Sequence, residues 1–370
     1  MKFLHIADCH VGCRQYGMKE REHDFYRALA SAADAAVDNG CDAIVVAGDL
    51  FDAVKPPAEA VCVVKDIVNA LKEKNVRVLG IEGNHDMTGN SYWLRVCGIE
   101  PLDRKVVEVN GVKFAGFNFQ RSDDLIQSLS DFSEPSTDED NSCDVIVLHA
   151  GLVELGDSFT GDLSVNSILP YLKKLGVKYV ALGHIHTYME PIYDGIHFVQ
   201  PGSTELKDVS EQLNKQAMLV EVSNGEVMQQ PVPLKTRPVE VITVKNEDEL
   251  HELLESGDTR RAFDGHLVVL YVANSVKDGV KRIEDMLSRH EVLFRVSVFD
   301  DGNGAQTPEY DRAKAIPTLA AAVDAFFDKG SEQHRLTSAI LETPANVRKI
   351  VEDYMNNKPG NNPNQKEAEK

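Results

Sequence analysis

Short, almost wholly apolar segments recur through the first two thirds of the sequence, and helical patterns separate the first of them. The apolar runs are FLHIA, AIVVA, VRVLGIE, VKFAGF (112–117), DVIVLH (144–149), KYVALG (178–183), IHFVQ (196–200) and AMLVEV (217–222). Helical patterns run from about Glu22 to Asn39 and from about Ala58 to Lys74. Several runs are too apolar to alternate between core and solvent, so we expect strands buried on both faces. The alternation indicates βαβ units and therefore an α/β fold.

A second unit begins where this pattern pauses, at the prolines between 231 and 238. Beyond them come VEVITV, a helix around 247–255, HLVVLYV, a helix around 276–289 and VLFRVSVF, which together predict a small βαβαβ-like module. After the linker DDGNG (300–304), apolar residues at helical spacing predict two or three amphipathic helices, and Thr343-Pro344 is a plausible start for one. Residues 358–370 carry too little apolar surface to fold, so we expect a disordered tail there. We therefore expect the chain to divide into four regions, which are residues 1–232, 233–304, 305–357 and 358–370.

Composition indicates an ordinary soluble protein, with 42% hydrophobic and 26% charged residues. No apolar run approaches the roughly 20 residues that span a bilayer, and the N-terminus enters a strand pattern without a signal-peptide core. Six cysteines are scattered without a CxxC pair, which is typical of reduced thiols. We therefore expect a cytoplasmic protein without disulfides and without a membrane partner.

The formal charge of −20 bears on possible partners, because a nucleic-acid-binding protein normally has a basic surface. Part of the excess is local, since residues 122–144 contain eight acidic residues and no Lys or Arg. We interpret this stretch as a solvated insertion. If the protein acts on DNA, the attraction must come from a local basic surface, from bound metal ions or from a partner subunit.

Five segments place metal-ligand residue types directly after an apolar run. They are Asp8-Cys9-His10, Gly48-Asp49, Gly83-Asn84-His85-Asp86, His149 and Gly183-His184-Ile185-His186. Ligands of open α/β sheets bind beyond the carboxyl ends of the strands, so five such ends can converge on one crevice. Oxygen and imidazole donors together suit manganese, iron or zinc, whereas carboxylates alone would suit magnesium or calcium.

These donors suffice for two divalent ions that share one carboxylate. We expect Asp8, His10, Asp49 and His186 to hold one ion, and Asp49, Asn84, His149 and His184 to hold the other. Two carboxylates leave two divalent cations with net positive charge, which attracts an anionic phosphate. Two such metal ions lower the pKa of a water molecule that they share, and they stabilise the attacking and leaving oxygens of an in-line displacement. The pattern therefore predicts hydrolysis of phosphate esters.

His85 is the candidate catalytic residue, either to protonate the leaving oxygen or to stabilise the charge of the transition state. Asp86 is expected to fix the tautomer and orientation of His85. Each segment alone also has an ordinary explanation, because a GD or GNHD after a strand is often only a turn, and the five together favour the metal site. His5, His23 and His197 lack this context, and Cys9 and Cys13 are more readily explained by packing than by ligation.

The five segments resemble the calcineurin-like metallophosphoesterase superfamily, whose signature is DxH, GD, GNH(D/E), H and GHxH in that order. The resemblance implies a four-layer β-sandwich flanked by helices. It also implies the metal ligands and the catalytic histidine proposed above. It leaves the substrate open, because the superfamily includes protein phosphatases, cyclic-nucleotide phosphodiesterases, nucleotidases and nucleases.

Further segments resemble the SbcD-type DNA-repair nucleases, the partners of SbcC-type ATPases with long coiled coils. They are FLHIADCHVG, AGDLFDAVKPPAEAV (47–61), the Gln200–Ser203 turn and VPLKTRP (232–238). The resemblance implies a manganese-dependent exonuclease on double-stranded ends and endonuclease on single strands, acting as a homodimer. It further implies that 1–232 is the nuclease domain, 233–304 a capping domain that positions DNA, and 305–357 the ATPase-binding segment.

One position departs from part of this family. Archaeal and eukaryotic relatives have a second functional histidine where this chain has Asp52, whereas bacterial SbcD-like proteins resemble this chain in having Asp. This favours a bacterial or phage origin. Two alternatives stay open: a phosphoesterase of phosphoproteins or small phosphate esters, and a metal-binding protein that has lost its activity. GDLFDAV and GNHD differ from the GDxxDRG and GNHE of protein phosphatases, which disfavours the first.

Overall fold

Two six-stranded sheets form the larger part of the described chain. The computed structural model describes residues 1–134, 140–155, 161–223, 225–255 and 263–300. The first sheet has the order β14-β13-β1-β2-β3-β4. Its strands are β1 (Lys2–Ile6), β2 (Ala43–Ala47), β3 (Arg77–Ile81), β4 (Glu100–Pro101), β13 (Gln216–Ser223) and β14 (Glu226–Pro233). The second sheet has the order β11-β12-β10-β7-β6-β5. Its strands are β5 (Val107–Val109), β6 (Val112–Phe117), β7 (Val145–His149), β10 (Tyr179–Gly183), β11 (Ile192–Tyr193) and β12 (Ile196–Val199).

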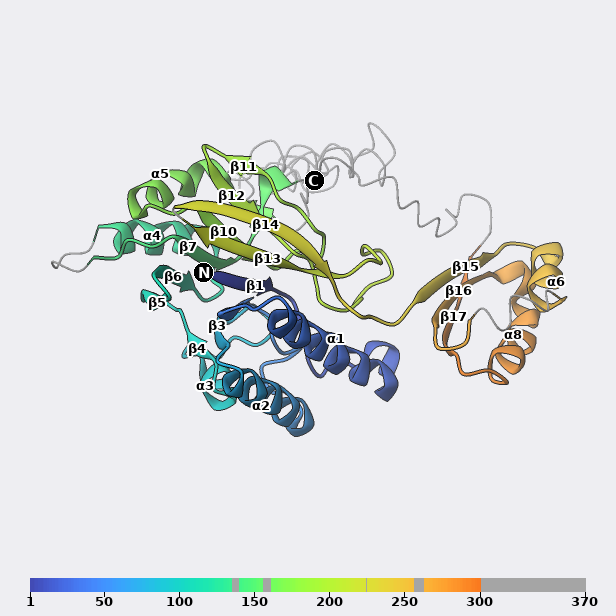
Figure 1. Ribbon diagram of the computed structural model, residues 1–370. Coiled ribbons are helices and arrows are strands. Elements are labelled where there is room, and N and C mark those ends of the chain that lie inside the picture. Colours follow the sequence, from blue (N-terminus) through green and yellow to red (C-terminus); the bar gives the residue numbers. More distant parts are fainter. Residues whose placement is uncertain (135–139, 156–160, 224, 256–262, 301–370) are drawn as a thin grey trace, which may run out of the picture. The chain divides into compact units, whose positions relative to one another are not determined.

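The two sheets pack face to face, and helices cover their outer faces. Inward-facing residues of both sheets, among them Phe3, Phe114 and Tyr179, share one buried core. The outer face of the first sheet packs against α1 (Lys19–Asp38), α2 (Ala58–Glu73) and α3 (Tyr92–Cys97). The outer face of the second sheet is covered by α4 (Ser122–Ser133) and α5 (Val165–Leu175) (Figure 1). The result is the predicted four-layer sandwich.

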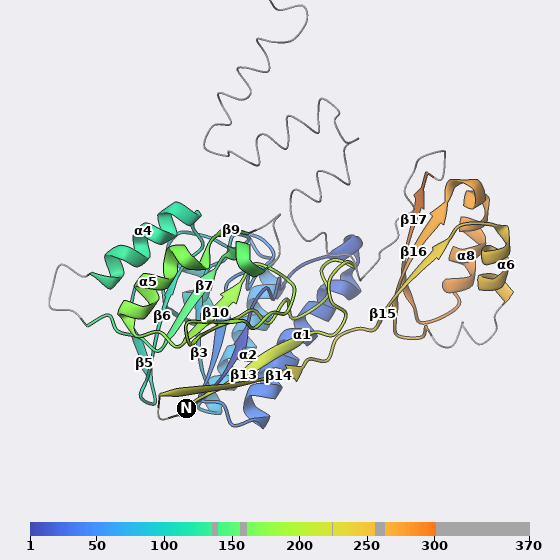
Figure 2. The ribbon, with the colours of Figure 1, turned by 90° about the horizontal axis from the view of Figure 1, so that it is seen from above.

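The strands run as the apolar pattern predicts. β1, β2 and β3 are parallel, as are β6, β7, β10 and β12. All residues of β2, β7 and β10 are buried, because helices cover one side of each sheet and the other sheet covers the opposite side. The five ligand-bearing segments lie at the carboxyl ends of β1, β2, β3, β7 and β10. Figure 2 shows the ribbon from above.

The acidic stretch 122–144 differs from its interpretation as a solvated insertion. Its first part is helix α4, in which Leu125, Leu129 and Phe132 are buried. These residues lie at i, i+4 and i+7, so they form one apolar face while the acidic residues occupy the solvent side. Phe132 packs edge-on against Phe117 of β6, with ring centroids 5.4 Å apart. The first part of this stretch is therefore an ordinary amphipathic helix, which the number of acidic residues alone did not indicate.

The module after the prolines has the predicted βαβαβ order. Its strands β15 (Val239–Val244), β16 (Leu267–Ala273) and β17 (Leu293–Phe299) are all parallel, in the order β15-β16-β17. Helices α6 (Glu247–Glu255) and α8 (Val280–Leu287) pack on one face around Leu250 and Ile283, and the 3-10 helix η3 (Asn274–Gly279) precedes α8. The amphipathic helices expected after residue 310 lie outside the described residues.

The remaining short elements lie in the loops between these strands and helices. They are η1 (Gln15–Gly17), β8 (Gly151–Leu152), η2 (Val153–Leu155) and β9 (Gly161–Leu163). All six cysteines are free thiols. Within the described ranges, no helix combines the length and the apolar character needed to cross a membrane.

Candidate metal centre

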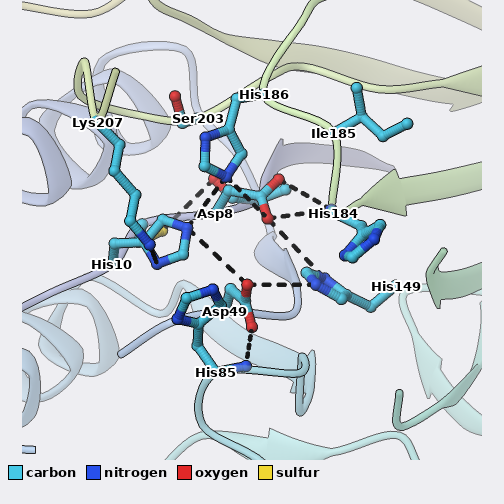
Figure 3. A network of polar contacts seen from close by, with 12 residues as sticks. Asp8, His10, Asp49, His85, His149, His184, Ile185, His186, Ser203 and Lys207 are labelled. Atoms are coloured by element: carbon cyan, nitrogen blue, oxygen red, sulfur yellow. Dashed lines mark hydrogen bonds and ion pairs between the residues drawn. The ribbon is translucent and has the colours of Figure 1, made fainter. Parts of the chain in front are cut away.

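The proposed metal ligands lie together at the carboxyl ends of five strands; Figure 3 shows six of them, and Asn84 contacts His149 and His184. Asp8 and His10 follow β1, Asp49 follows β2 and Asn84 follows β3, whereas His149 ends β7, and His184 and His186 follow β10. Each sheet therefore contributes part of the site. Four of these residues have left-handed backbone conformations that are rare outside glycine, with φ of 52° at Asp8, 43° at His10, 47° at Asp49 and 95° at His184. Such conformations cluster at functional sites, where the surrounding structure enforces them.

Asp8, His10 and His186 form the first group of donors. Their ligand atoms lie within 4.8 Å of one another. His10 Nε2 and His186 Nε2 face each other at 3.1 Å, and His186 Nε2 lies 3.9 Å from Asp8 Oδ1. The Asp8 carboxylate is fully buried and accepts the backbone N–H of His184 at 3.0 Å. Two facing imidazole nitrogens beside a carboxylate are a suitable arrangement for one cation.

Asp49, Asn84, His149 and His184 form the second group. His149 Nε2 lies 3.4 Å from Asp49 Oδ2 and 3.0 Å from Asn84 Oδ1. His184 Nδ1 lies 2.9 Å from the same Asn84 oxygen. Asp49 Oδ2 also lies 3.9 Å from His10 Nε2, so the Asp49 carboxylate stands between the two groups, as a bridging ligand must.

His85 lies at the edge of this cluster with its side chain 38% exposed, and its ring meets that of His10 edge-on at 4.8 Å. Its Nδ1 lies 3.1 Å from the backbone carbonyl oxygen of Asp52, and its backbone N–H donates to Asp49. Asp86 has a different role from the expected one, because its buried carboxylate accepts the N–H groups of Phe51 and Gly83. The Asp52 carbonyl therefore orients His85, and Asp86 joins the two loops that carry Asp49 and Asn84.

The pKa values of the cluster follow from burial and close charges. Burial raises the pKa of Asp8 to about 6, and burial with the nearby Asp49 charge raises the pKa of Asp86 to about 7. Burial opposes protonation of His149, but the charges of Asp49 and Asp8 outweigh it and raise the pKa of His149 to about 9. The pKa of His10 is lowered to about 4, chiefly by burial. The charges of Asp49 and Asp8 that raise the pKa of His149 are the same charges that a bound cation would satisfy.

The outward ring nitrogens test whether these histidines suit metal ions. His149 Nδ1–H donates to the carbonyl of Ala47 at 2.8 Å, and His186 Nδ1–H donates to Glu211 Oε1 at 2.7 Å. Both bonds leave the Nε2 lone pair directed into the cluster, which is the tautomer a metal ligand requires. His10 Nδ1 lies near both Asp52 Oδ1, at 3.2 Å, and Lys207 Nζ, at 3.0 Å. Lys207 is itself paired with that carboxylate at 2.8 Å, so His10 Nδ1 faces an ion pair of Lys207 and Asp52.

Three residues around the ligands were not identified as functional from the sequence. Asp52 was noted only as a departure from part of the family, and Lys207 and Glu211 were not singled out. Glu211 and Lys207 belong to the segment after β12, which carries no ligand of its own. The Gln200–Ser203 turn was the only sequence signal near them.

The glycine before Asp49 allows two loops to approach closely. Gly48 has φ of +87°, and a Cβ atom there would lie 2.6 Å from Cγ of His149 and closer still to Nδ1. We expect Gly48→Ala to displace His149, to abolish binding of the second ion and to destabilise the fold by more than backbone strain alone. Left-handed strain costs about 1–2 kcal/mol and overpacking roughly 1–3 kcal/mol more.

Gly176→Ala is the matched control for this prediction. Gly176 has a similar φ of +80°, and a Cβ there meets no atom within 4 Å. Urea unfolding should show a larger loss for Gly48→Ala than for Gly176→Ala, and Mn²⁺ titration should show two intact sites only in the control. Equal losses with intact metal binding in both would mean that the close approach to His149 has no role.

Comparisons with known proteins show the family of the chain. The sequence profile of the calcineurin-like phosphoesterase family matches residues 1–188, which contain all the proposed ligands, and the chain therefore belongs to this family. The chain is similar to the DNA double-strand break repair protein Mre11 of Methanococcus maripaludis, with 30% identity over 57% of this chain and 59% of that protein. It is 26% identical to Mre11 of Thermoplasma acidophilum over 85% of each chain. Among solved structures it is similar to TT1561 of Thermus thermophilus, with a TM-score of 0.40 and 13% identity over 62% of this chain and 98% of that chain.

Proposed function

We propose that this chain is a manganese-dependent DNA nuclease that hydrolyses phosphodiester bonds in double-strand break repair. The observation that carries the proposal is the convergence of the seven donors on one buried cluster, with Asp49 between two groups. The family gives the reaction class, which is hydrolysis of phosphate esters. The choice of DNA is supported by the similarity to the Mre11 repair proteins and by the SbcD-like segments described above.

The division of roles follows from the contacts of each side chain. Asp8, His10 and His186 would hold one ion, Asn84, His149 and His184 the other, and Asp49 would bridge them. The bound ions supply charge to neutralise the phosphate and to lower the pKa of a water. His85, which is half-exposed at the edge of the cluster, is placed to donate a proton to the leaving oxygen or to stabilise its charge. The proposed catalytic residue is therefore His85. Asp86 supports the loops, and the seven ligands hold the ions.

Partners are part of the same proposal. The net charge of −20 is unfavourable for binding DNA alone, so much of the affinity must come from local surfaces, from the ions or from a partner. We infer an SbcC-type ATPase as that partner, bound through the region after residue 310, and a homodimer of this chain. The module within 233–304 is proposed to position DNA. We infer these features from resemblance to SbcD-type nucleases.

Cleavage assays with the purified chain test this function. We expect Mn²⁺-dependent degradation of linear duplex DNA and nicking of single-stranded or hairpin DNA, faster with an SbcC-type ATPase and absent after chelation. The same preparation should be tested on a phosphomonoester and on a phosphopeptide. Rapid hydrolysis of either, with DNA left intact even when the ATPase is present, would establish the alternative phosphoesterase and overturn the choice of DNA.

A further inference from the structure

A buried polar network lies behind the first group of donors, in the segment that follows β12. Its centre is the Glu211 side chain, which is 8% exposed and makes five hydrogen bonds. One of them joins Oε1 to Nδ1 of His186 at 2.7 Å. Oε2 accepts bonds from Ser203 Oγ at 2.8 Å and from Lys215 Nζ at 2.5 Å. A buried carboxylate therefore contacts a proposed metal ligand from behind.

The network is held in place by its own neighbours. Lys215 is 4% exposed and also donates to Ser203 Oγ, so it neutralises Glu211 inside the protein. The fully buried Arg21 of α1 donates to the carbonyl of Leu206, and Gln15 donates to the carbonyl of Lys207. Ser203 bridges to Ala7, next to Asp8. These contacts fix the segment 203–215 against the same loops that carry Asp8 and His10.

The two proposed ion sites differ in what orients their histidines. At the first site the outward nitrogens of His10 and His186 face carboxylates, those of Asp52 and Glu211. At the second site His149 Nδ1 faces the neutral backbone carbonyl of Ala47. A carboxylate fixes the tautomer as a carbonyl does, and its charge also makes the imidazole a stronger donor to a cation. The carboxylates behind His10 and His186 are themselves paired with Lys207 and Lys215, whereas the carbonyl behind His149 carries no charge.

We propose that Glu211 is a positioning residue that selectively strengthens the ion site formed by Asp8, His10 and His186. The segment 203–215 is thereby part of the metal centre although it contributes no ligand. This inference rests on the proposed two-metal site and does not depend on the choice of DNA as substrate. Loss of such an outer carboxylate typically weakens metal binding by about 10- to 100-fold.

The test is calorimetric titration of the metal-free full-length protein with Mn²⁺. The wild type should bind two ions. In Glu211→Gln one affinity should fall by about 10- to 100-fold while the other stays unchanged. Glu211→Gln/Lys215→Met removes both buried charges, so it should give the same metal-binding defect without leaving Lys215 unpaired.

Two controls separate positioning from a general structural role. Glu22→Gln removes a carboxylate on α1 whose side chain is 0% exposed and which binds Arg14 and Tyr26, and both Mn²⁺ sites should persist. In the background of His186→Ala, which lacks the oriented ring, Glu211→Gln should cause no further loss of affinity. Thermal unfolding of each metal-free variant reports stability separately.

Three results would overturn the inference: unchanged affinities in Glu211→Gln, an equal decrease at both sites, or a full additional decrease in the His186→Ala background. If the wild type binds fewer than two ions, the two-metal proposal itself is wrong. If two ions bind and DNA is not cleaved, only the substrate assignment fails. The outcomes are therefore distinguishable.

Discussion

Asp49→Ala is expected to abolish Mn²⁺ binding at both sites and to reduce DNA cleavage on the order of 10³-fold or more. The Asp49 carboxylate lies 3.4 Å from His149 Nε2 and 3.9 Å from His10 Nε2, so its loss removes the bridging oxygen and half of the carboxylate charge of the ligand set. Metal ions contribute several kcal/mol of transition-state stabilisation, and each 1.36 kcal/mol corresponds to about a factor of ten in rate. Single-turnover cleavage and calorimetric Mn²⁺ titration measure the two effects.

The control for this prediction is Asp131→Ala. Asp131 is an exposed aspartate on α4 that accepts a hydrogen bond from Gln127, and it belongs to none of the groups of donors. Its removal should leave two Mn²⁺ sites and full activity. Retention of two tight sites in Asp49→Ala would contradict the bridging role.

His85→Ala is expected to retain both Mn²⁺ sites and to lose about 10²- to 10⁴-fold in the cleavage rate. The His85 ring contacts His10 edge-on and the Asp52 carbonyl, and the hydrogen bond of His85 to Asp49 comes from its backbone N–H, which alanine retains. A half-exposed imidazole beside the cluster can reach a bound phosphate, and its loss removes proton donation or charge stabilisation at the leaving oxygen. The expected signature is therefore a decrease in kcat with unchanged metal affinity.

A second histidine gives the comparison for His85. His23 on α1 is 46% exposed and pairs with Glu59, away from the strand ends, so His23→Ala should cleave DNA at the wild-type rate. A DNA substrate with a better leaving group at one position should partly rescue His85→Ala if the residue acts as a proton donor. Full turnover in His85→Ala with two ions bound would show that His85 has no catalytic role.

The ligand set could be proposed from the sequence because the information that points to it is local. Each donor follows an apolar run, and apolar runs of this length form buried strands whose carboxyl ends meet at one edge. The run AIVVA is strand β2, with Asp49 just beyond it, and the run DVIVLH ends at His149 in β7. Periodicity likewise predicted α1, α2 and the module after residue 239, with helix ends shifted by a few residues.

The supports of the ligands could not be predicted, because their contacts join segments that are remote in the sequence. Asp52 faces His10, and Lys207 reaches the same carboxylate from 155 positions further along the chain. Glu211 reaches His186 only because Arg21 and Ser203 hold its segment against the loops after β1 and β10. No spacing rule connects such residues, and a buried glutamate in a loop has no pattern of its own.

The sequence by itself was enough to propose the seven donors and to predict the buried strands whose ends carry them, since both depend on hydrophobic periodicity and on residue type. Only the tertiary structure decided which group contacts each imidazole ring: the backbone carbonyl of Asp52 rather than the Asp86 side chain for His85, and the Glu211 carboxylate for His186. The physical reason is that hydrophobic burial is encoded along the chain at short range. Hydrogen bonds to a ring nitrogen, in contrast, require atoms within about 3 Å, and only packing brings these atoms together.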